Sequence, residues 1–380
     1  MKAIVNGKIF DGDKFLENKV LLFEGKEIVN IISTEELEER YAGVEVIDAM
    51  GGYVTPGYMD LQINGCGGVL FNDSVTRETL EIMNRTNLKY GCTSFTPTLI
   101  TTGDENIEKA LELVGNMEDK EDIGVLGLHI EGPYISVKKK GIHNPKFIRK
   151  MDERMLNKIV EAGTKATTII TVAPENISGE YISTLAKSGI KVALGHTNAT
   201  YKEVEEKKIF GISLATHLYN GMSSFAHREP GAAGAVLDMD IKAGIIVDGM
   251  HSDYASVRIA HRIMGDRLYL VTDAVSPVGT DMEYFYFEGN KVYHKDGKCF
   301  GEDGTLGGSA LTMDAGVRNL VKYVGVTKEE AIRMATLYPA KAVSLDNKYG
   351  RLQPGFMADI LILNHKLEVV HVFAKGNLVK

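Results

Sequence analysis

Hydrophobic and polar positions follow two different patterns along this chain. Near both ends, in residues 1–54 and 350–380, apolar and polar positions alternate in short runs such as KAIVNGKIF, KVLLFEGKEIVNII and LEVVHVFAKGNLVK. Alternation with a period of two is typical of β-strands that bury one face. We therefore predict that the two ends of the chain pair to form one small β domain.

Residues 55–349 follow the other pattern, in which short apolar runs are separated by amphipathic segments of helical period. Such runs are typical of strands buried in a parallel sheet, and the segments between them of the connecting helices. Eight repeats favour a (β/α)8 barrel, and a doubly wound open sheet is the alternative. The predicted strands are YVTPGYMDLQI, CTSFTPTLI, IGVLGLHI, ATTIITVA, KVALGH, ISLATH, AGIIVD and LYLVTD.

The amphipathic segments carry helix start and stop signals. A helix is predicted over residues 78–91, where apolar residues recur on one face. The segment 152–163 ends in Gly163, a residue suited to the left-handed position after a helix. The segment 252–265 begins with Ser252, which can cap the first turn.

Composition and charge limit the functional classes. The chain has 380 residues, of which 44% are hydrophobic and 25% charged, as in ordinary soluble globular proteins. Its net charge of −8 argues against a nucleic-acid-binding surface, which would be basic, and means that an anionic substrate needs a local cationic pocket. No apolar run approaches the roughly 20 residues of a membrane span, so we expect neither nucleic acid nor membrane as a partner.

Cysteine usage and the first residues bear on localisation. The only cysteines are Cys66, Cys92 and Cys299, and no two of them form a Cys-x-x-Cys pair. Few, unpaired cysteines fit a reducing compartment and no disulfide framework. The first residues, MKAIVNGKIFDGD, alternate like a strand and lack the apolar centre of a signal peptide. We therefore expect a cytoplasmic protein.

Three residues with metal-binding side chains each end one of the predicted strands. Glu131 ends GLHIE, His196 ends VALGH and His217 ends SLATH. The carboxyl ends of barrel strands converge, and two imidazoles with one carboxylate can hold a catalytic zinc whose fourth position stays open. Taken alone, Glu131 could be a common acidic strand end, and a histidine at position 196 is more typical of a hydrogen-bonded loop. Together, and with the two histidines one repeat apart, they predict a metal site.

Asp273 ends the eighth predicted strand, in LYLVTD. A carboxylate beside a metal-activated water can take the proton of that water and pass it to a leaving amine. The alternative is an aspartate at the barrel rim that caps the segment Ala274–Ser276.

The first predicted strand carries Gln62 and Asn64, which lie two residues apart and so face the same way. Amides are poor zinc ligands, so this strand does not obviously supply a second metal site. His129 shares a face with Glu131 and can orient a metal ligand from behind. A packed histidine with satisfied hydrogen bonds is the alternative.

Cationic and glycine-rich segments suggest where an anion binds. Arg228 in HREPG and His251 in DGMH can together hold a phosphate. The run Lys138–Lys140, shortly before His143, is interpreted as a solvated loop. Residues 305–313, TLGGSALTM, are predicted to form a glycine-rich turn into a helix whose amino terminus can bind an anion or line a pocket.

An ordered series of motifs along essentially the whole chain resembles one enzyme family. The motifs are PGYMDLQINGCGG, HIEGP, KKGIHNP, GHTNA, THLYNGM, REPG, VDGMH, VTDA and GTLGGSALTM. Together they resemble the N-acetylglucosamine-6-phosphate deacetylases of the amidohydrolase superfamily. The resemblance implies a (β/α)8 barrel with a small β-sandwich from both termini. It also implies hydrolysis of N-acetylglucosamine 6-phosphate to glucosamine 6-phosphate and acetate, in amino-sugar catabolism and cell-wall sugar recycling.

The resemblance also implies roles for single residues. It makes Glu131, His196 and His217 the ligands of one divalent metal, with Zn2+ favoured over Fe2+ or Co2+. It makes Asp273 the general base and acid, and His143 the residue that polarises the amide carbonyl. It implies a homodimer or homotetramer in which the neighbouring subunit completes the phosphate site. The implied substrate contacts are Ile142, His143, Asn220, Gly221, Arg228, His251, Leu306, Gly307 and Gly308.

One departure from the superfamily pattern limits the metal count. The commonest superfamily pattern on the first strand is His-x-His, whereas this chain has Gln62 and Asn64 there. A subset of these deacetylases shares the change and resembles single-metal enzymes. A second metal at Gln62 and Asn64 is therefore not expected.

Other functions remain as alternatives. Sibling enzymes include an N-acetylgalactosamine-6-phosphate deacetylase, a dihydroorotase-like cyclic amidase and an amino-acid deacetylase. The last two have no need for Arg228 and His251 as a phosphate clamp. A non-catalytic barrel that serves in assembly would be expected to lose metal ligands or the base, and this chain keeps all four residues.

Overall fold

The computed structural model describes residues 1–287 and 289–380, which form two compact units. The first unit comprises Met1–Met59, Asn87–Ser94 and Met313–Lys380, and the second comprises Asp60–Thr86 and Phe95–Thr312. The division into domains at residues 54/55 and 349/350 stays a prediction. None of the helices in the described part of the chain is long and apolar enough to span a bilayer.

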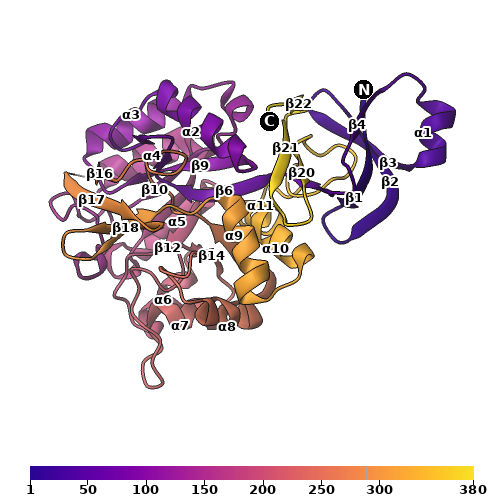
Figure 1. The fold of residues 1–380 in the computed structure, drawn as a ribbon. Coiled ribbons are helices and arrows are strands. Elements are labelled where there is room, and N and C mark those ends of the chain that lie inside the picture. The colour runs from indigo at the N-terminus through magenta and orange to yellow at the C-terminus, as the bar shows by residue number, and fades with distance from the viewer. Residues whose placement is uncertain (288) are drawn as a thin grey trace. The chain divides into compact units, whose positions relative to one another are not determined.

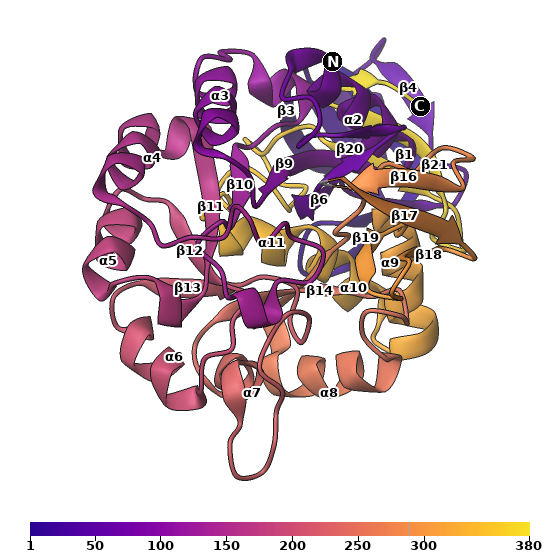
Figure 2. The same ribbon diagram turned by 90° about the vertical axis from the view of Figure 1, so that its left-hand side faces the viewer.

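The second unit contains most of a parallel barrel, whose strands β6 and β9 begin in the first unit (Figures 1 and 2). The strand order runs without interruption from β6 to β15, and the ends join because Asp273 N–H donates to the carbonyl of Gln62 at 2.9 Å beside a bridge between Ile63 and Ala274. The strands are β6 (Tyr58–Ile63), β9 (Cys92–Ile100), β10 (Leu128–Glu131), β11 (Thr167–Val172), β12 (Lys191–Leu194), β13 (Ile212–Ala215), β14 (Lys242–Ile246) and β15 (Leu268–Val271). The predicted barrel is confirmed.

Helices connect the strands on the outside of the barrel, as Figure 2 shows for α3 to α8. Helix α4, for example, buries an apolar stripe that includes Met155 and Ile159 and leaves charged residues outside, whereas α7 is buried over almost its whole length. The helices are α2 (Arg77–Lys89), α3 (Asp104–Gly115), α4 (Glu153–Ala166), α5 (Gly179–Lys187), α6 (Tyr201–Lys208), α7 (Gly231–Asp238) and α8 (Tyr254–Met264).

Two predicted helix ends need correction. Gly163 adopts a left-handed φ of 58° as expected, but the chain resumes helical geometry and α4 continues to Ala166. The cap of α8 is Asp253, whose carboxylate accepts from the N–H of Ala255 at 2.7 Å, and not Ser252. Serine and aspartate are both good N-caps, but Asp253 is the residue that directly precedes the first turn of α8.

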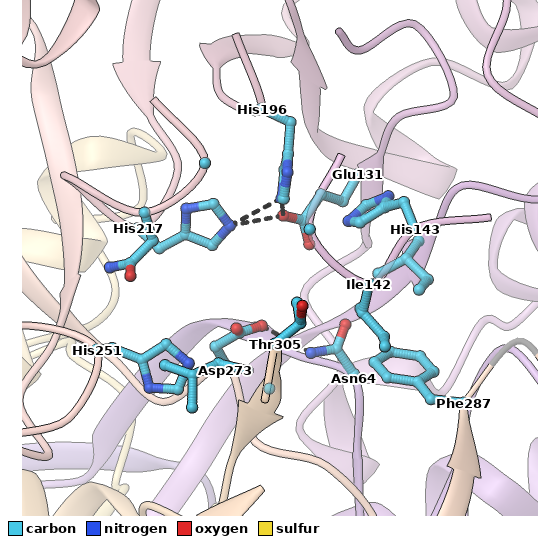
Figure 3. A pocket seen from close by; sticks show the side chains of 16 residues that line it. Asn64, Glu131, Ile142, His143, His196, His217, His251, Asp273, Phe287 and Thr305 are labelled. Atoms are coloured by element: carbon cyan, nitrogen blue, oxygen red, sulfur yellow. Dashed lines mark hydrogen bonds and ion pairs between the residues drawn. The ribbon is translucent and has the colours of Figure 1, made fainter. Parts of the chain in front are cut away.

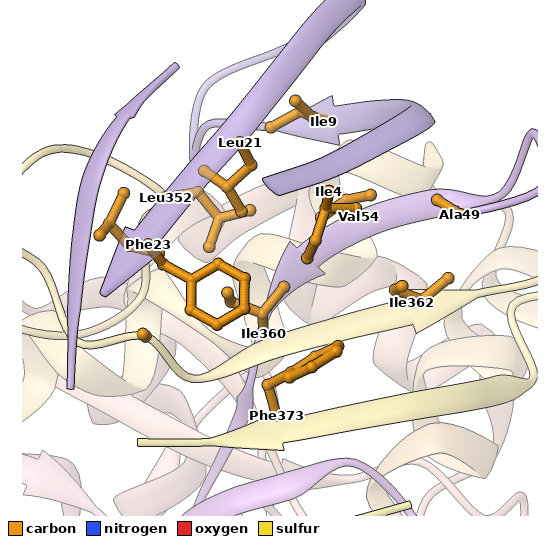
Figure 4. Close-up of a cluster of buried hydrophobic side chains, with 12 residues drawn as sticks. Ile4, Ile9, Leu21, Phe23, Ala49, Val54, Leu352, Ile360, Ile362 and Phe373 are labelled. Atoms are coloured by element: carbon orange, nitrogen blue, oxygen red, sulfur yellow. The ribbon is translucent and has the colours of Figure 1, made fainter. Parts of the chain in front are cut away.

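The first unit is a mixed sheet made from both ends of the chain. The antiparallel pairing of β5 with β20 joins the two ends, and the rings of Phe23 and Phe373 meet edge to face with centroids 5.4 Å apart in its apolar core (Figure 4). The predicted β-sandwich region at the termini is confirmed. Its strands are β1 (Lys2–Phe10), β2 (Phe15–Glu24), β3 (Glu27–Ser33), β4 (Glu45–Asp48), β5 (Tyr53–Pro56), β20 (Ile360–Leu363), β21 (Val369–Ala374) and β22 (Asn377–Leu378).

The same unit holds helices α1 (Thr34–Arg40), α9 (Met313–Asn319), α10 (Lys328–Ala335) and α11 (Leu337–Ala342). The first predicted barrel strand proved to be two strands. Its first part is β5 in the terminal sheet, and its second part is β6 in the barrel. Gly57 lies between them at a close approach, since a Cβ there would lie 2.1 Å from the hydroxyl of Thr93.

A small antiparallel sheet follows the barrel strands and was not predicted. It consists of β16 (Tyr284–Phe287), β17 (Asn290–Lys295), β18 (Lys298–Gly301) and β19 (Leu306–Ser309). The predicted glycine-rich turn at 305–313 is instead largely a strand, because residues 306–309 pair with β18, but the segment does lead into a helix, α9, at Met313. Gly308 is needed there, since its φ is +74° and a Cβ would lie 2.5 Å from Val275.

Candidate active site

A cavity of about 240 Å³ lies at the carboxyl ends of the barrel strands. Glu131 is the last residue of β10, and His196 and His217 lie two residues beyond β12 and β13. Asp273 lies two residues beyond β15. All four side chains line this cavity, so the barrel brings together the four residues that the sequence placed at separate strand ends (Figure 3).

The donor atoms of Glu131, His196 and His217 form a tight triangle. Glu131 Oε1 lies 3.0 Å from Nε2 of each histidine, and the two Nε2 atoms lie 3.1 Å apart. Ligands at about 2.0–2.1 Å from a tetrahedral zinc are separated from one another by roughly 3.3 Å. Two imidazole nitrogens and one carboxylate oxygen at this spacing fit a single divalent ion.

His143 also lies within ligand range. A ring nitrogen of His143, a nitrogen of His196 and a carboxylate oxygen of Glu131 lie within 4.8 Å of one another. Nδ1 of His143 is already hydrogen-bonded to the hydroxyl of Thr101 at 2.7 Å. The triangle with His217 is much tighter, so His143 is placed beside the ligand set and not in it.

The triangle keeps its carboxylate ionised. Burial acts to raise the pKa of Glu131, but hydrogen bonds from His196 and His217 outweigh this effect and hold the pKa well below its usual value. Burial acts to lower the pKa of His217, and its hydrogen bond to Glu131 raises it above the usual value. An ionised carboxylate is the form that binds a cation.

Asp273 faces the triangle across the cavity (Figure 3) and is held by two amides. Its Oδ1 accepts from Asn64 Nδ2 at 2.7 Å and from Gln62 Nε2 at 3.1 Å. Gln62 Nε2 also lies 3.3 Å from Glu131 Oε2. Burial raises the pKa of Asp273, and the negative charge of Glu131 raises it further. Within the described residues Oδ2 has no hydrogen-bond partner, so it is the oxygen available to a ligand.

The residues that end the strands have an unusual backbone. His196, His217 and Asp273 adopt positive φ angles of 45°, 30° and 53°. Residues other than glycine seldom adopt this conformation, and it is found at functional sites where surrounding contacts enforce it. Asp273, for example, is fixed on both sides, since its N–H donates to Gln62 and its carbonyl accepts from Ser309, each at 2.9 Å.

Comparison with known proteins agrees with this arrangement. A model of the amidohydrolase family matches residues 53–379. This chain belongs to the amidohydrolase family. A relative from Haemophilus influenzae, named N-acetylglucosamine-6-phosphate deacetylase, is 42% identical over 377 residues, which are 98% of each chain. A relative from Shewanella sp. (strain ANA-3), named N-acetylgalactosamine-6-phosphate deacetylase, is 37% identical over 86% of this chain and 83% of its own length.

The fold also matches a solved structure. The crystal structure of N-acetylglucosamine-6-phosphate deacetylase from Pasteurella multocida superposes with a TM-score of 0.95 at 41% identity and covers 99% of both chains. Parallel barrels carry their chemistry at the rim where the strands end, and Glu131, His196 and His217 lie at that rim in this chain.

Most of the predicted substrate contacts of the amidohydrolase line the same cavity. His251 is held there by Asp248, whose Oδ2 lies 2.7 Å from His251 Nδ1. Gly221 must be glycine, because its φ is +59° and a Cβ would lie 2.8 Å from His196 Nδ1. The predicted contacts found in the lining are Ile142, His143, Asn220, Gly221, His251, Leu306 and Gly308.

Three predicted residues lie elsewhere. Arg228 is exposed in the loop between β13 and α7, which projects away from the barrel in Figure 2. Gly307 is not part of the lining and faces Val292. His129 lies behind the cavity, and its two ring nitrogens are bonded to the carbonyl of Leu61 at 3.1 Å and the hydroxyl of Thr171 at 2.7 Å. Burial lowers the pKa of His129 to about 4.

Sequence reasoning placed Leu306 and Gly308 of β19 at the cavity but missed the β16 part of the small sheet. Phe287 of β16 and Thr305 before β19 line the cavity. Two signals were present. Residues 284–287 read Tyr-Phe-Tyr-Phe and alternate between exposed and buried, and Asp296-Gly297 is a typical two-residue hairpin turn. Both turn residues have the positive φ that this hairpin requires.

Proposed function

We propose that this amidohydrolase hydrolyses N-acetyl-D-glucosamine 6-phosphate to D-glucosamine 6-phosphate and acetate, in amino-sugar catabolism and cell-wall sugar recycling. The observation that carries the proposal is the triangle of Glu131, His196 and His217 with Asp273 opposite it in one cavity. The named activity of the Haemophilus influenzae relative supports the substrate.

Glu131, His196 and His217 would hold one divalent metal, for which the mixed nitrogen and oxygen donors favour Zn2+ and also suit Fe2+ or Co2+. When bound, the ion polarises the amide carbonyl and makes a neighbouring water more acidic. Gln62 and Asn64 donate hydrogen bonds to Asp273 in place of binding a second ion. We therefore propose one metal per chain.

Asp273 would serve as general base and then as general acid. Its Oδ1 is fixed by the two amides, so Oδ2 takes a proton from the attacking water and later gives it to the amine nitrogen as the C–N bond breaks. Burial that raises the pKa of Asp273 suits a carboxylate that carries a proton during part of the cycle.

His143 would stabilise the charge that develops on the amide oxygen. It is buried and lines the cavity beside the triangle. Burial lowers its pKa well below the usual value, and the neighbouring His196 lowers it further. A neutral imidazole can donate one hydrogen bond to the carbonyl oxygen as that oxygen becomes negative. The sugar and its acetyl group would contact the other predicted residues of the lining, which are Ile142, Asn220, Gly221, Leu306 and Gly308.

The phosphate would bind between His251 of one subunit and Arg228 of its neighbour. His251 lines the cavity, whereas Arg228 lies in the exposed loop that projects from the barrel. A projecting guanidinium suits bidentate contact with a phosphate held in another copy of the chain. We therefore propose a homodimer or homotetramer, and a cytoplasmic location where phosphorylated sugars occur.

Acetate release from three sugars tests the proposal. We expect rapid hydrolysis of N-acetylglucosamine 6-phosphate and poor hydrolysis of unphosphorylated N-acetylglucosamine. Absence of acetate release from the phosphorylated sugar by the zinc-loaded protein would contradict the proposed function.

N-acetylgalactosamine 6-phosphate is the third sugar and the second candidate substrate. The Shewanella relative, which is 37% identical to this chain, carries the corresponding name. If kcat/KM is higher for this epimer than for N-acetylglucosamine 6-phosphate, the protein is an N-acetylgalactosamine-6-phosphate deacetylase instead.

A further inference from the structure

The two ring nitrogens of His143 have different surroundings. Nδ1 lies 2.7 Å from the hydroxyl of Thr101. Within the described residues Nε2 has no hydrogen-bond partner, and the ring lines the cavity beside Glu131 (Figure 3). In a neutral imidazole one nitrogen donates and the other accepts, so the partner of Nδ1 decides what Nε2 offers to a ligand.

The buried hydroxyl of Thr101 has one possible acceptor for its proton among the described residues. The residue directly follows the last residue of β9, and none of its surface is exposed. Its hydroxyl has one hydrogen-bond partner among the described residues, Nδ1 of His143. A buried hydroxyl proton needs an acceptor. The proton is therefore satisfied only if Thr101 donates to Nδ1, and Nδ1 must then carry no proton.

The glycine of the HIEGP motif makes room for this hydroxyl. Gly132 has a φ of +86°, and a Cβ there would lie 2.3 Å from the hydroxyl oxygen of Thr101. Gly132 directly follows Glu131, so the strand end that carries the carboxylate ligand also admits Thr101. A side chain at position 132 would displace the hydroxyl from His143 or shift the strand end.

We propose that Thr101 is a positioning residue whose hydroxyl donates to His143 Nδ1, holds the imidazole as the tautomer with its proton on Nε2, and so directs an N–H at the amide oxygen of the substrate. The inference rests on the proposed function for the identity of that amide. It also explains why His143 stays out of the metal-ligand set although it lies within range, since a protonated Nε2 has no lone pair for an ion.

The tautomer can be observed without substrate. In the zinc-loaded full-length protein labelled with 15N in histidine, we expect His143 to show a protonated Nε2 and a hydrogen-bonded, unprotonated Nδ1. A protonated Nδ1, or an Nε2 bound to the metal, would overturn the proposal. This result does not depend on turnover, so it is separate from the acetate-release test of the proposed function.

Three variants test the consequence for catalysis. Thr101→Val removes the hydroxyl with little change in shape, and we expect kcat to fall by roughly two- to tenfold, the fold-change of one neutral hydrogen bond, with KM and metal content unchanged. Thr101→Ser keeps the hydroxyl and should restore kcat. Thr96→Val is the matched control, because this buried hydroxyl lies in β9, the strand that ends just before Thr101, and has no partner among the described residues.

The outcomes separate the two roles of His143. An unchanged kcat in Thr101→Val would show that the hydroxyl does not position the donor. Loss of metal from Thr101→Val would show that the hydroxyl supports a ligand instead. If Thr101→Val does not fold, the tautomer of the unaltered protein and the kcat of Thr101→Ser still decide.

Discussion

The two compact units of this protein each bury charged side chains, but they do so in different ways. In the terminal unit Lys375 Nζ lies 3.0 Å from Asp359 Oδ2 and also donates to the carbonyl of Thr93, and both charged side chains are 5% exposed. Asp359 Oδ1 accepts the N–H of Lys375. Each charge therefore has an opposite charge and further hydrogen bonds, as a buried ion pair requires.

The barrel unit buries its charges without such complete pairing. Nε2 of His196 and Nε2 of His217 both lie next to Glu131 Oε1 and also next to each other. Asp273 Oδ2 has no partner among the described residues. His196, His217 and Asp273 have positive φ angles. A buried charge whose hydrogen bonds are all satisfied within the protein thus indicates a structural ion pair. Ligand atoms that converge on one point indicate a place for a ligand.

Breaking the structural pair should have the largest effect on stability. Lys375→Met leaves the Asp359 carboxylate buried and unpaired, and we expect the free energy of unfolding to fall by about 3–5 kcal/mol. Urea unfolding measures this change, and the kcat of the folded fraction should stay normal. Lys8→Met is the matched control, because it breaks the exposed pair with Glu17 and should hardly shift Tm. Equal losses in the two variants would remove the contrast between buried and exposed pairs.

Asp273, the proposed general base, should behave in the opposite way. Asp273→Asn keeps the shape but removes the proton acceptor, so we expect kcat to fall by roughly 10² or more while the metal stays bound. Stability should fall little or rise, since a buried charge with incomplete pairing is removed. Steady-state kinetics, elemental analysis and thermal unfolding measure the three quantities. Near-normal turnover would refute the role of Asp273.

The exposed cation should affect substrate binding alone. Arg228→Ala should raise KM for the phosphorylated sugar by about tenfold to 150-fold, equivalent to a charge-assisted contact of roughly 1.5–3 kcal/mol, and leave the weak use of N-acetylglucosamine unchanged. Arg85→Ala removes the same charge from an exposed position on α2 and serves as the control. Equal losses for both sugars would count against a phosphate contact.

Mixed oligomers show which subunit supplies Arg228. Hybrids of Arg228→Ala chains with Asp273→Asn chains should recover activity, because a chain with an intact catalytic site receives Arg228 from its neighbour. Absence of recovery in verified hybrids would mean that each chain builds its own phosphate site.

A third kind of buried acid gives a pH-dependent effect. Asp60 is paired with neutral groups only, the hydroxyl and N–H of Thr272 and the N–H of Gln62, and burial raises its pKa to about 7 from an ordinary value of 3.8. The Asp60 carboxylate therefore binds a proton more tightly in the folded protein than in the unfolded chain. The resulting stability is present below about pH 4 and is lost as the pH rises through about 7.

Replacing this acid should remove that dependence. Relative to Asp60→Asn, the unaltered protein should lose up to about 1.4 kcal/mol of unfolding free energy for each pH unit between about 4 and 7. Urea unfolding of both proteins across this range measures the difference, in which the other titrating groups cancel. Parallel pH profiles would show that Asp60 is charged in the folded state throughout.

The barrel could be predicted from the sequence because the alternation of apolar strand runs and amphipathic helical segments is a local pattern. Each apolar run marks a strand, and Glu131, His196, His217 and Asp273 stand where those runs end. Strand ends of a parallel barrel meet at one rim, so linear position became spatial proximity without knowledge of any contact.

Other features depend on contacts between distant segments. The left-handed backbone of His217, the bond from Thr101 to His143 and the choice of Asp253 as helix cap follow from tertiary packing that no local pattern records. The strand at 306–309 was misread because glycine weakens a strand signal, although pairing with β18 and close approach to Val275 require it.

We propose that one metal ion in the triangle of Glu131, His196 and His217 enables deacetylation. The direct measurement is acetate release from N-acetylglucosamine 6-phosphate by metal-depleted protein titrated with Zn2+. We predict almost no activity at the start, a linear rise and a plateau at about one equivalent per chain, as expected for a single tight site. A plateau at two equivalents, or full activity in protein shown to be free of metal, would contradict the account.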